Sequence, residues 1–273
     1  MEIKYKGKSI HYRVKGKGPA LVLIHGFTES SAIWEDFAGD LADSFQVIIP
    51  DLPGHGQSES IGEVHTMLEM AAVVRELLDH LKVKHCVMIG HSMGGYVALS
   101  FGRQYAQMLV GLGLFHSTAL ADSPEASQNR KRAIALIKKN RQEFLFGFIP
   151  ELFAPENREG LKNEIDALVR TAGQMTPEAI VAAQEGMRMR VDGRDVLFAA
   201  DFPVMFIAGQ QDSRVPFESI QALSGIPGTA YSLFLKEAGH MGYLEARNET
   251  LGFVKFFAKT CVKAIQDTAT KPV

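Results

Sequence analysis

The chain contains few cysteines. Only Cys86 and Cys261 occur among 273 residues, and they form neither a CxxC pair nor a cluster of Cys and His with zinc spacing. Such a chain has neither a disulfide framework nor a structural zinc site. We therefore expect no metal and no cofactor, and Cys86, which lies inside an apolar run, should be a buried free thiol.

Long apolar runs and an excess of one charge sign are also missing. No run approaches the roughly 20 residues of a membrane-spanning helix, and the first 18 residues contain no apolar core of a signal peptide. The formal net charge is −2, so nothing favours nucleic acid or an anionic membrane as a partner. We expect a cytoplasmic protein whose partner is a small molecule; the sequence leaves open whether it forms a homodimer.

The sequence does contain a series of short apolar segments. Two alternating segments near the N-terminus are followed by six continuous apolar runs, at 20–26, 45–51, 85–90, 109–115, 202–209 and 230–237. Continuous runs are typical of strands that are covered on both faces, and helical patterns separate several of them. This alternation predicts an α/β fold with a mostly parallel sheet.

Strand patterns are absent between about 118 and 200, where the chain is richer in charge and has several helical patterns. We therefore predict a core made of residues 1–117 and 201–273, interrupted by a helical insertion at 118–200. An amphipathic helix over 251–265 should close the chain, and the end, 266–273, is expected to be disordered.

The segment GHSMGG at 90–95 contains a Gly-x-Ser-x-Gly pattern. Chance alone produces this pattern about one time in ten in a chain of this length. Here, however, it follows a predicted strand and begins a predicted helix, which is the setting in which a sharp turn exposes the serine at a helix N-terminus. We therefore interpret Ser92 as a candidate nucleophile rather than as a helix-capping serine.

A serine nucleophile needs a histidine base and an acid that orients the histidine. His240 lies in a glycine-flanked loop after the last predicted strand, and Asp212 follows the strand at 202–209. Asp122 is a competing acid, but it lies several residues too far beyond the strand at 109–115. We predict that Ser92, Asp212 and His240 are the catalytic residues.

Acyl transfer also requires donors for an oxyanion, usually two backbone N–H groups. We expect one from Met93, directly after the candidate nucleophile, and one from Phe27, in the loop after the first apolar run. His25 should shape that loop, and His91 should point away from the substrate.

These motifs resemble those of the α/β-hydrolase superfamily over nearly the whole chain. The matching segments are LVLIHGF…W (21–34), VIIPDLPGHGQS (47–58), MIGHSMGGYVAL (88–99), IAGQQDSRVP (207–216) and AGHMGYLE (238–245). The resemblance implies an α/β-hydrolase fold, a mostly parallel sheet of about eight strands flanked by helices, and a lid at 118–200. Carboxylesterases, perhydrolases and carbon–carbon bond hydrolases are the most similar groups.

The expected function is a serine hydrolase that cleaves a small to medium carboxylic ester through an acyl-enzyme. The predicted substrate pocket is lined by His25, His116, Phe146, Phe148, Val215 and Met241. One alternative is a carbon–carbon bond hydrolase, or a lyase like the menaquinone-pathway synthase, although Tyr96 stands where that enzyme usually has arginine. A second alternative is a ligand-binding receptor on the same fold.

Overall fold

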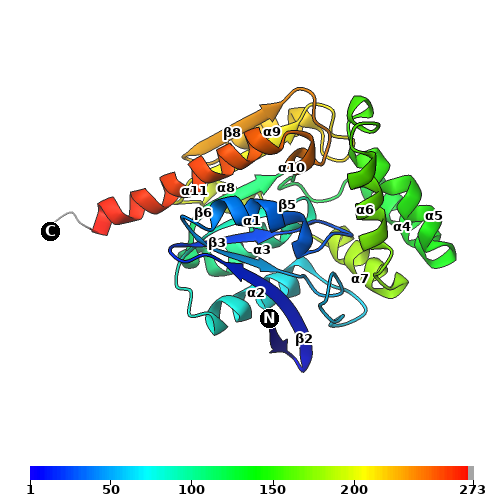
Figure 1. The fold of residues 1–273 in the computed structure, drawn as a ribbon, viewed down its shortest axis with the longest axis horizontal. Coiled ribbons are helices and arrows are strands. Elements are labelled where there is room, and N and C mark those ends of the chain that lie inside the picture. The colour runs from blue at the N-terminus through cyan, green and yellow to red at the C-terminus, as the bar shows by residue number, and fades with distance from the viewer. Residues whose placement is uncertain (270–273) are drawn as a thin grey trace.

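All eight segments that were predicted as strands belong to a single sheet (Figure 1). The computed structural model describes residues 1–269. The strand order is β1-β2-β4-β3-β5-β6-β7-β8, with antiparallel pairing at β1–β2 and β2–β4 and parallel pairing elsewhere. This confirms the predicted α/β fold with a mostly parallel sheet. The strands are β1 (Glu2–Tyr5), β2 (Lys8–Lys15), β3 (Ala20–Ile24), β4 (Gln46–Pro50), β5 (Cys86–His91), β6 (Leu109–Phe115), β7 (Val204–Gly209) and β8 (Ala230–Leu235).

Helices cover the central strands, whose continuous apolar runs are buried along their whole length in β3, β5 and β7. Helix α3 packs on β5 and β6, and α11 packs on β6 and β8. A β-carbon at Gly111 would lie 2.5 Å from Sγ of Cys261, so glycine is what lets α11 approach β6 this closely. The core helices are α1 (Glu35–Leu41), α2 (Met67–His80), α3 (Met93–Tyr105), α9 (Phe217–Ser224), α10 (Gly242–Glu245) and α11 (Arg247–Ala269).

Both cysteines are buried free thiols, as expected for Cys86. Burial raises the pKa of each thiol, Cys86 and Cys261, to about 12. Neither side chain therefore supplies a reactive thiolate at neutral pH.

The segment between β6 and β7 is helical. Figure 1 shows α4 to α7 (green to yellow) gathered beside one end of the sheet, and α4 packs against α7 whereas α8 contacts α3. Its helices are α4 (Pro124–Lys139), α5 (Arg141–Phe148), α6 (Lys162–Ala172), α7 (Pro177–Arg188) and α8 (Arg194–Phe198).

Local sequence determines where α4 and α7 begin. The side chains of Ser123 and Thr176 accept hydrogen bonds from the amides of Ala126 and Ala179, and a proline follows each capping residue. A hydroxyl cap supplies an acceptor for a free amide, and proline in the first turn lacks an amide that would need one.

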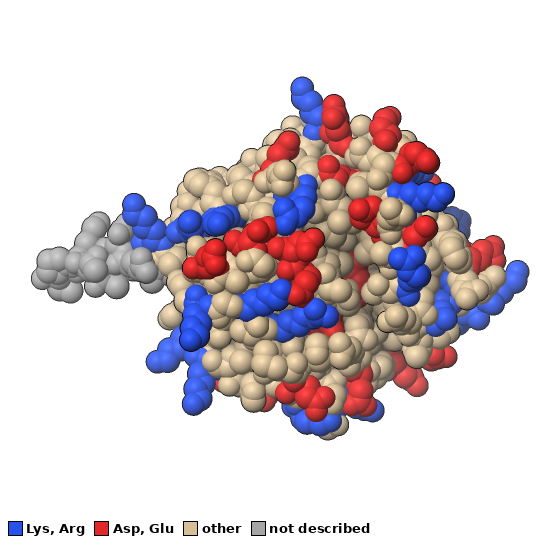
Figure 2. Space-filling model, viewed as in Figure 1, with Lys and Arg blue, Asp and Glu red and all other residues tan. Residues whose placement is uncertain are grey.

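At the C-terminus, the prediction of disorder from residue 266 onward is wrong for its first part. Helix α11 continues to Ala269 (Figure 1). Residues 270–273 lie outside the described part of the chain. Helix α11 has 23 residues but is not apolar enough to cross a membrane, and the same holds for every other helix within residues 1–269. Figure 2 shows acidic and basic side chains interspersed on the face in view, consistent with the small net charge.

Candidate active site

Ser92 lies at a sharp turn between β5 and α3. Its backbone is left-handed, with φ 51° and ψ −116°. Such a conformation is strained for a residue with a side chain, and close contacts on both sides enforce it. A β-carbon at Gly90 would lie 2.1 Å from the Gly94 backbone, and one at Gly94 would lie 2.5 Å from the Ile24 carbonyl oxygen. The two glycines of the motif therefore permit the turn that presents Ser92.

A continuous hydrogen-bond chain runs from Ser92 to Asp212 through His240. Ser92 Oγ lies 2.8 Å from Nε2 of His240, and Nδ1 of His240 lies 2.8 Å from Oδ2 of Asp212. The other carboxylate oxygen of Asp212 accepts from the amides of Arg214 and Val215, at 2.8 and 3.0 Å. The structure thus brings together the three residues that the sequence singled out. Their geometry matches a serine, its base and an orienting acid.

Asp212 is ionised in this arrangement. Burial alone would raise the pKa of its carboxyl, but the neighbouring His240 and His116 outweigh burial and hold the pKa well below its usual value. An ionised carboxylate accepts the Nδ1 hydrogen of His240, which leaves Nε2 facing Ser92 as the acceptor. The ring is then set up to take a proton from the serine hydroxyl.

His116 also contacts this carboxylate, instead of lining the pocket as predicted. Its Nδ1 lies 3.2 Å from Oδ2 of Asp212, and the side chain is fully buried. The residue follows β6 with a φ of +46°, which turns the ring toward Asp212. Burial lowers the pKa of His116, although Asp212 opposes this effect. His116 is therefore neutral, donates from Nδ1, and leaves a buried Nε2 without a partner among the described side chains.

His116, Asp212 and His240 also form the one group in the described chain with metal-ligand spacing. One ligand atom from each lies within 4.8 Å of the others. The nitrogen and oxygen atoms concerned already bond to one another. A metal ion at this position would therefore compete with the contacts that orient His240.

Glu245 holds the loop that carries His240. Its carboxylate accepts hydrogen bonds from the amides of Gly239 and Met241, at 3.0 Å each, and from the amide of Ala154 at 2.8 Å. The amide of His240 itself donates to the carbonyl of Leu152 at 2.7 Å. Glu245 ends the matched segment AGHMGYLE but was not predicted as a site residue.

A second buried network lies beneath the site and centres on Glu29 and His91. Glu29 Oε2 lies 3.0 Å from Nδ1 of His91 and accepts from the amide of Gly26, while Tyr243 donates its hydroxyl to Oε1 at 3.1 Å. The other ring nitrogen of His91 lies 2.9 Å from the carbonyl oxygen of His240. Because both ring nitrogens face acceptors, His91 carries both protons and is a cation.

The shifted pKa values agree with this charge assignment. Burial alone would raise the pKa of Glu29 and lower that of His91. The attraction between the two opposite charges is stronger than the effect of burial on either group. The pKa of Glu29 is therefore lowered, and that of His91 is raised. His91 points away from the cavity, as expected, and the pair joins three loops of the site; Glu29 carried no recognisable sequence signal.

Two backbone amides next to Ser92 are candidates for an oxyanion hole. Met93 is the first residue of α3, and Phe27 lies in the loop after β3. Within residues 1–269, neither amide donates to another backbone group. His25 shapes the Phe27 loop: its Nδ1 bonds the Gly26 carbonyl at 2.8 Å and its Nε2 accepts from the amide of Leu52 at 3.0 Å.

A cavity of about 330 Å³ opens beside Ser92 and His240. Of the six predicted pocket residues, Phe148 and Val215 line it, and Phe27 does so as well. The other four lie outside the lining. His25 and His116 are fully buried in the hydrogen bonds described above, Met241 is buried beneath the site, and Phe146 points to solvent with 64% of its surface exposed.

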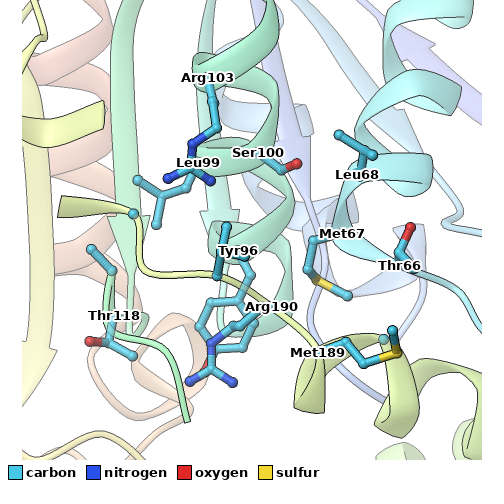
Figure 3. A pocket seen from close by; sticks show the side chains of 14 residues that line it. Thr66, Met67, Leu68, Tyr96, Leu99, Ser100, Arg103, Thr118, Met189 and Arg190 are labelled. Carbon is cyan, nitrogen blue, oxygen red and sulfur yellow. The ribbon is translucent and has the colours of Figure 1, made fainter. Parts of the chain in front are cut away.

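A second cavity, of about 350 Å³, lies on the other side of Tyr96 (Figure 3). Tyr96 lines both cavities, and the Arg190 guanidinium lies 4.1 Å from the centre of its ring. In Figure 3, Met67 and Met189 approach the second cavity from α2 and from the end of α7. Tyr96, directly after the SMGG segment, therefore separates the two cavities.

A parallel sheet with a serine at a strand-to-helix turn, followed in the chain by an acid and then a histidine, defines a class of α/β proteins. The chain belongs to the α/β hydrolase fold family, whose model matches residues 19–247. A thermophilic esterase from Thermogutta terrifontis has a similar structure, with a TM-score of 0.90 and 30% identity over 96% of this chain and 99% of that chain.

Curated relatives include a pimeloyl-[acyl-carrier protein] methyl ester esterase of Vibrio vulnificus. It is 26% identical over 247 residues, which cover 86% of this chain and 92% of that protein. Uncharacterized proteins of Mycobacterium tuberculosis and Mycobacterium bovis are 40% identical over 98 residues. That match covers 36% of this chain but only 29% of the length of the mycobacterial proteins.

Proposed function

We propose that the protein is a serine hydrolase that cleaves a small to medium carboxylic ester. The observation that carries this proposal is the hydrogen-bond chain from Ser92 through His240 to Asp212, at 2.8 Å for each link, at the wall of a cavity. The esterases of Vibrio vulnificus and Thermogutta terrifontis, as their names describe them, support the same reaction class.

In the first half of the reaction, Ser92 Oγ bonds to the ester carbonyl carbon and its proton passes to Nε2 of His240. The amides of Phe27 and Met93 stabilise the oxyanion of the tetrahedral intermediate. The bond to the alkoxy oxygen then breaks, and His240 returns the proton to the leaving alcohol. Asp212 stabilises the histidinium through Nδ1 during this step.

In the second half, His240 takes a proton from water, and the resulting hydroxide bonds to the acyl carbon of the acyl-enzyme. The second tetrahedral intermediate collapses by breaking the bond to Ser92 Oγ, which regains its proton from His240. The products are one carboxylic acid and one alcohol for each ester and water consumed.

We also propose that residues 118–200 act as a lid that selects the acyl or alcohol group. This rests on the cavity lining, because α4, α5 and α7 supply more than half of it. The residues concerned are Ala126, Asn129, Arg130, Ala133, Phe144, Phe148, Gln184 and Met187.

The test is labelling with a fluorophosphonate, followed by intact-mass measurement. The wild-type protein should gain one label. The Ser92→Ala variant should gain none, and its kcat for ester hydrolysis should fall by a factor on the order of 10⁶. Ser224→Ala, a serine outside the cavity lining, is the matched control and should behave like the wild type. Full ester hydrolysis by a folded Ser92→Ala variant would contradict the proposal.

A further inference from the structure

The cavity beside Ser92 has an imbalance of charge. Among its lining residues in the described chain, Arg130 and Arg214 carry permanent charges, and no Asp or Glu is present. Most of the remaining lining is apolar, including Phe27, Phe144 and Phe148. A small apolar cavity with two cations and no anion is suited to a ligand that brings negative charge.

Arg130 is only partly neutralised. Its Nε and one terminal nitrogen donate to the two carboxylate oxygens of Asp122 at 2.6 and 3.4 Å, and its other terminal nitrogen donates to Gln184 Oε1 at 3.1 Å. The same Asp122 carboxylate accepts from Arg190, so one buried anion serves two guanidinium groups. This cluster of three side chains retains a net positive charge.

Arg214 has no carboxylate partner among the described side chains. Among the side chains that the structure describes, residues 1–264, its guanidinium forms no ion pair, and its carbon atom lies 4.7 Å from the centre of the Phe148 ring. Two acids act on it from a distance, but Asp212 is bonded to His240, and Glu151 is paired with Arg158 at 2.8 Å. Although Arg214 is exposed, the groups around it desolvate its guanidinium and lower its pKa, and Arg130 lowers the pKa further, whereas Asp212 and Glu151 oppose the shift.

We propose that the substrate is an ester that carries a free carboxylate in the same molecule, and that Arg214, beside Arg130, binds this carboxylate. The inference rests on the proposed ester hydrolysis. Arg214 is exposed to solvent and lines the cavity, so its unpaired charge attracts an anion that enters there. A guanidinium offers two parallel donors that match a carboxylate. The apolar lining would then cover a short alkyl chain between the carboxylate and the ester.

Paired substrates test this directly. Methyl hydrogen adipate and methyl hexanoate differ in a carboxylate on the acyl side, whereas 4-acetoxybutanoate and butyl acetate differ in one on the alcohol side. Hydrolysis is followed as proton release at constant pH. At low salt, kcat/KM for at least one carboxylate-bearing ester should exceed that of its neutral partner by on the order of tenfold to a hundredfold. The pair that shows the preference identifies the side of the ester that enters the arginine site.

Arg214→Gln should bring this ratio close to one, mainly by raising KM for the carboxylate-bearing ester. Arg214→Lys should retain part of the ratio because it keeps the charge but not the paired donors. Arg247→Gln is the matched control, since Arg247 pairs with Asp40 at 2.6 Å and lies outside the cavity lining. Melting temperatures verify that each variant is folded.

The failures of the two proposals are distinguishable. Equal kcat/KM within both pairs in the wild type, or a preference that survives in Arg214→Gln, would overturn the carboxylate site while ester hydrolysis stands. No hydrolysis of any ester and no fluorophosphonate labelling would overturn the proposed function, and the carboxylate site with it.

Discussion

Replacing Glu29 with glutamine tests whether the buried network beneath the site is an ion pair. The change preserves the shape of the side chain and removes its charge. The amide oxygen can still accept from Gly26 and His91, and the amide nitrogen then faces the Tyr243 hydroxyl, which can accept. His91, however, keeps two acceptors around its ring, one of them the His240 carbonyl at 2.9 Å. It must either remain an unpaired buried cation or lose a proton and leave one contact unsatisfied.

The expected destabilisation follows from burial. The side chains of His91 and Glu29 are only 1% and 4% exposed, so solvent screens their interaction little. Removing one partner of a buried pair costs about 3 to 5 kcal/mol in the free energy of unfolding. For a domain of this size, each kcal/mol lowers the melting temperature by about 2 to 4 °C. We therefore expect Glu29→Gln to melt roughly 6 to 20 °C below the wild type.

The assay is thermal unfolding by circular dichroism, with Glu35→Gln as the control. Glu35 pairs with Arg13 at 2.7 Å, but its side chain is 40% exposed. Exposed pairs contribute about 0 to 1 kcal/mol, so the control should melt within a few degrees of the wild type. A Glu29→Gln variant that melts as high as Glu35→Gln would refute the ion pair.

The pH dependence adds a second criterion. The pKa of His91 is raised, so its stabilisation is complete below its unfolded value and is lost as pH rises through the folded pKa. The pKa of Glu29 is lowered, so its stabilisation is present above the unfolded value and is lost as pH falls through the folded pKa. The gap in melting temperature between wild type and Glu29→Gln should therefore be largest between the unfolded values of 4.5 for Glu29 and 6.5 for His91. A gap that stays constant from acid to alkaline pH would show that charge is not its cause.

Four further substitutions, at three positions, probe the site and its walls. Asp212→Asn should lower kcat by about 10⁴ with little change in KM, because it disturbs the orientation of His240. Steady-state kinetics measure both constants, and a variant with the wild-type kcat would mean that another residue orients His240. Phe27→Pro removes one candidate oxyanion donor and should lower kcat by roughly 10² to 10³, whereas Phe27→Ala keeps the amide and should mainly change KM; equal losses in two folded variants would contradict the oxyanion assignment. Tyr96→Ala opens the wall between the cavities of about 330 and 350 Å³, so kcat/KM over a series of aryl esters should shift toward longer chains; an unchanged chain-length profile would mean that the cavities stay separate.

The sequence alone was sufficient where short-range sterics and periodicity decide the structure. One close approach at the Ser92 turn is between Gly90 and the backbone of Gly94, only four positions apart, so five letters and the flanking apolar run predict the turn. Strand ends were predictable for the same reason. Because parallel strands end at one edge of the sheet, the loops with Ser92, Asp212 and His240 were expected to meet there.

Side-chain direction and long-range charge pairing needed the tertiary structure. Phe146 and Phe148 are equally apolar, but two positions in a helix turn a side chain by about 200°, so Phe148 lines the cavity while Phe146 is exposed. His116 directly follows β6 beside the site, yet its left-handed backbone points the ring at Asp212.

The charged contacts show the same division. Glu29 contacts His91, and Arg214 lines the cavity without a carboxylate partner among the described side chains, only because distant segments fold against one another. Apolar periodicity and glycine spacing are properties of neighbouring residues, and the sequence therefore determined the sheet and the serine turn. Which charges find partners, and which face an open cavity, depends on distances between elements far apart in the chain, and only the tertiary structure decided those.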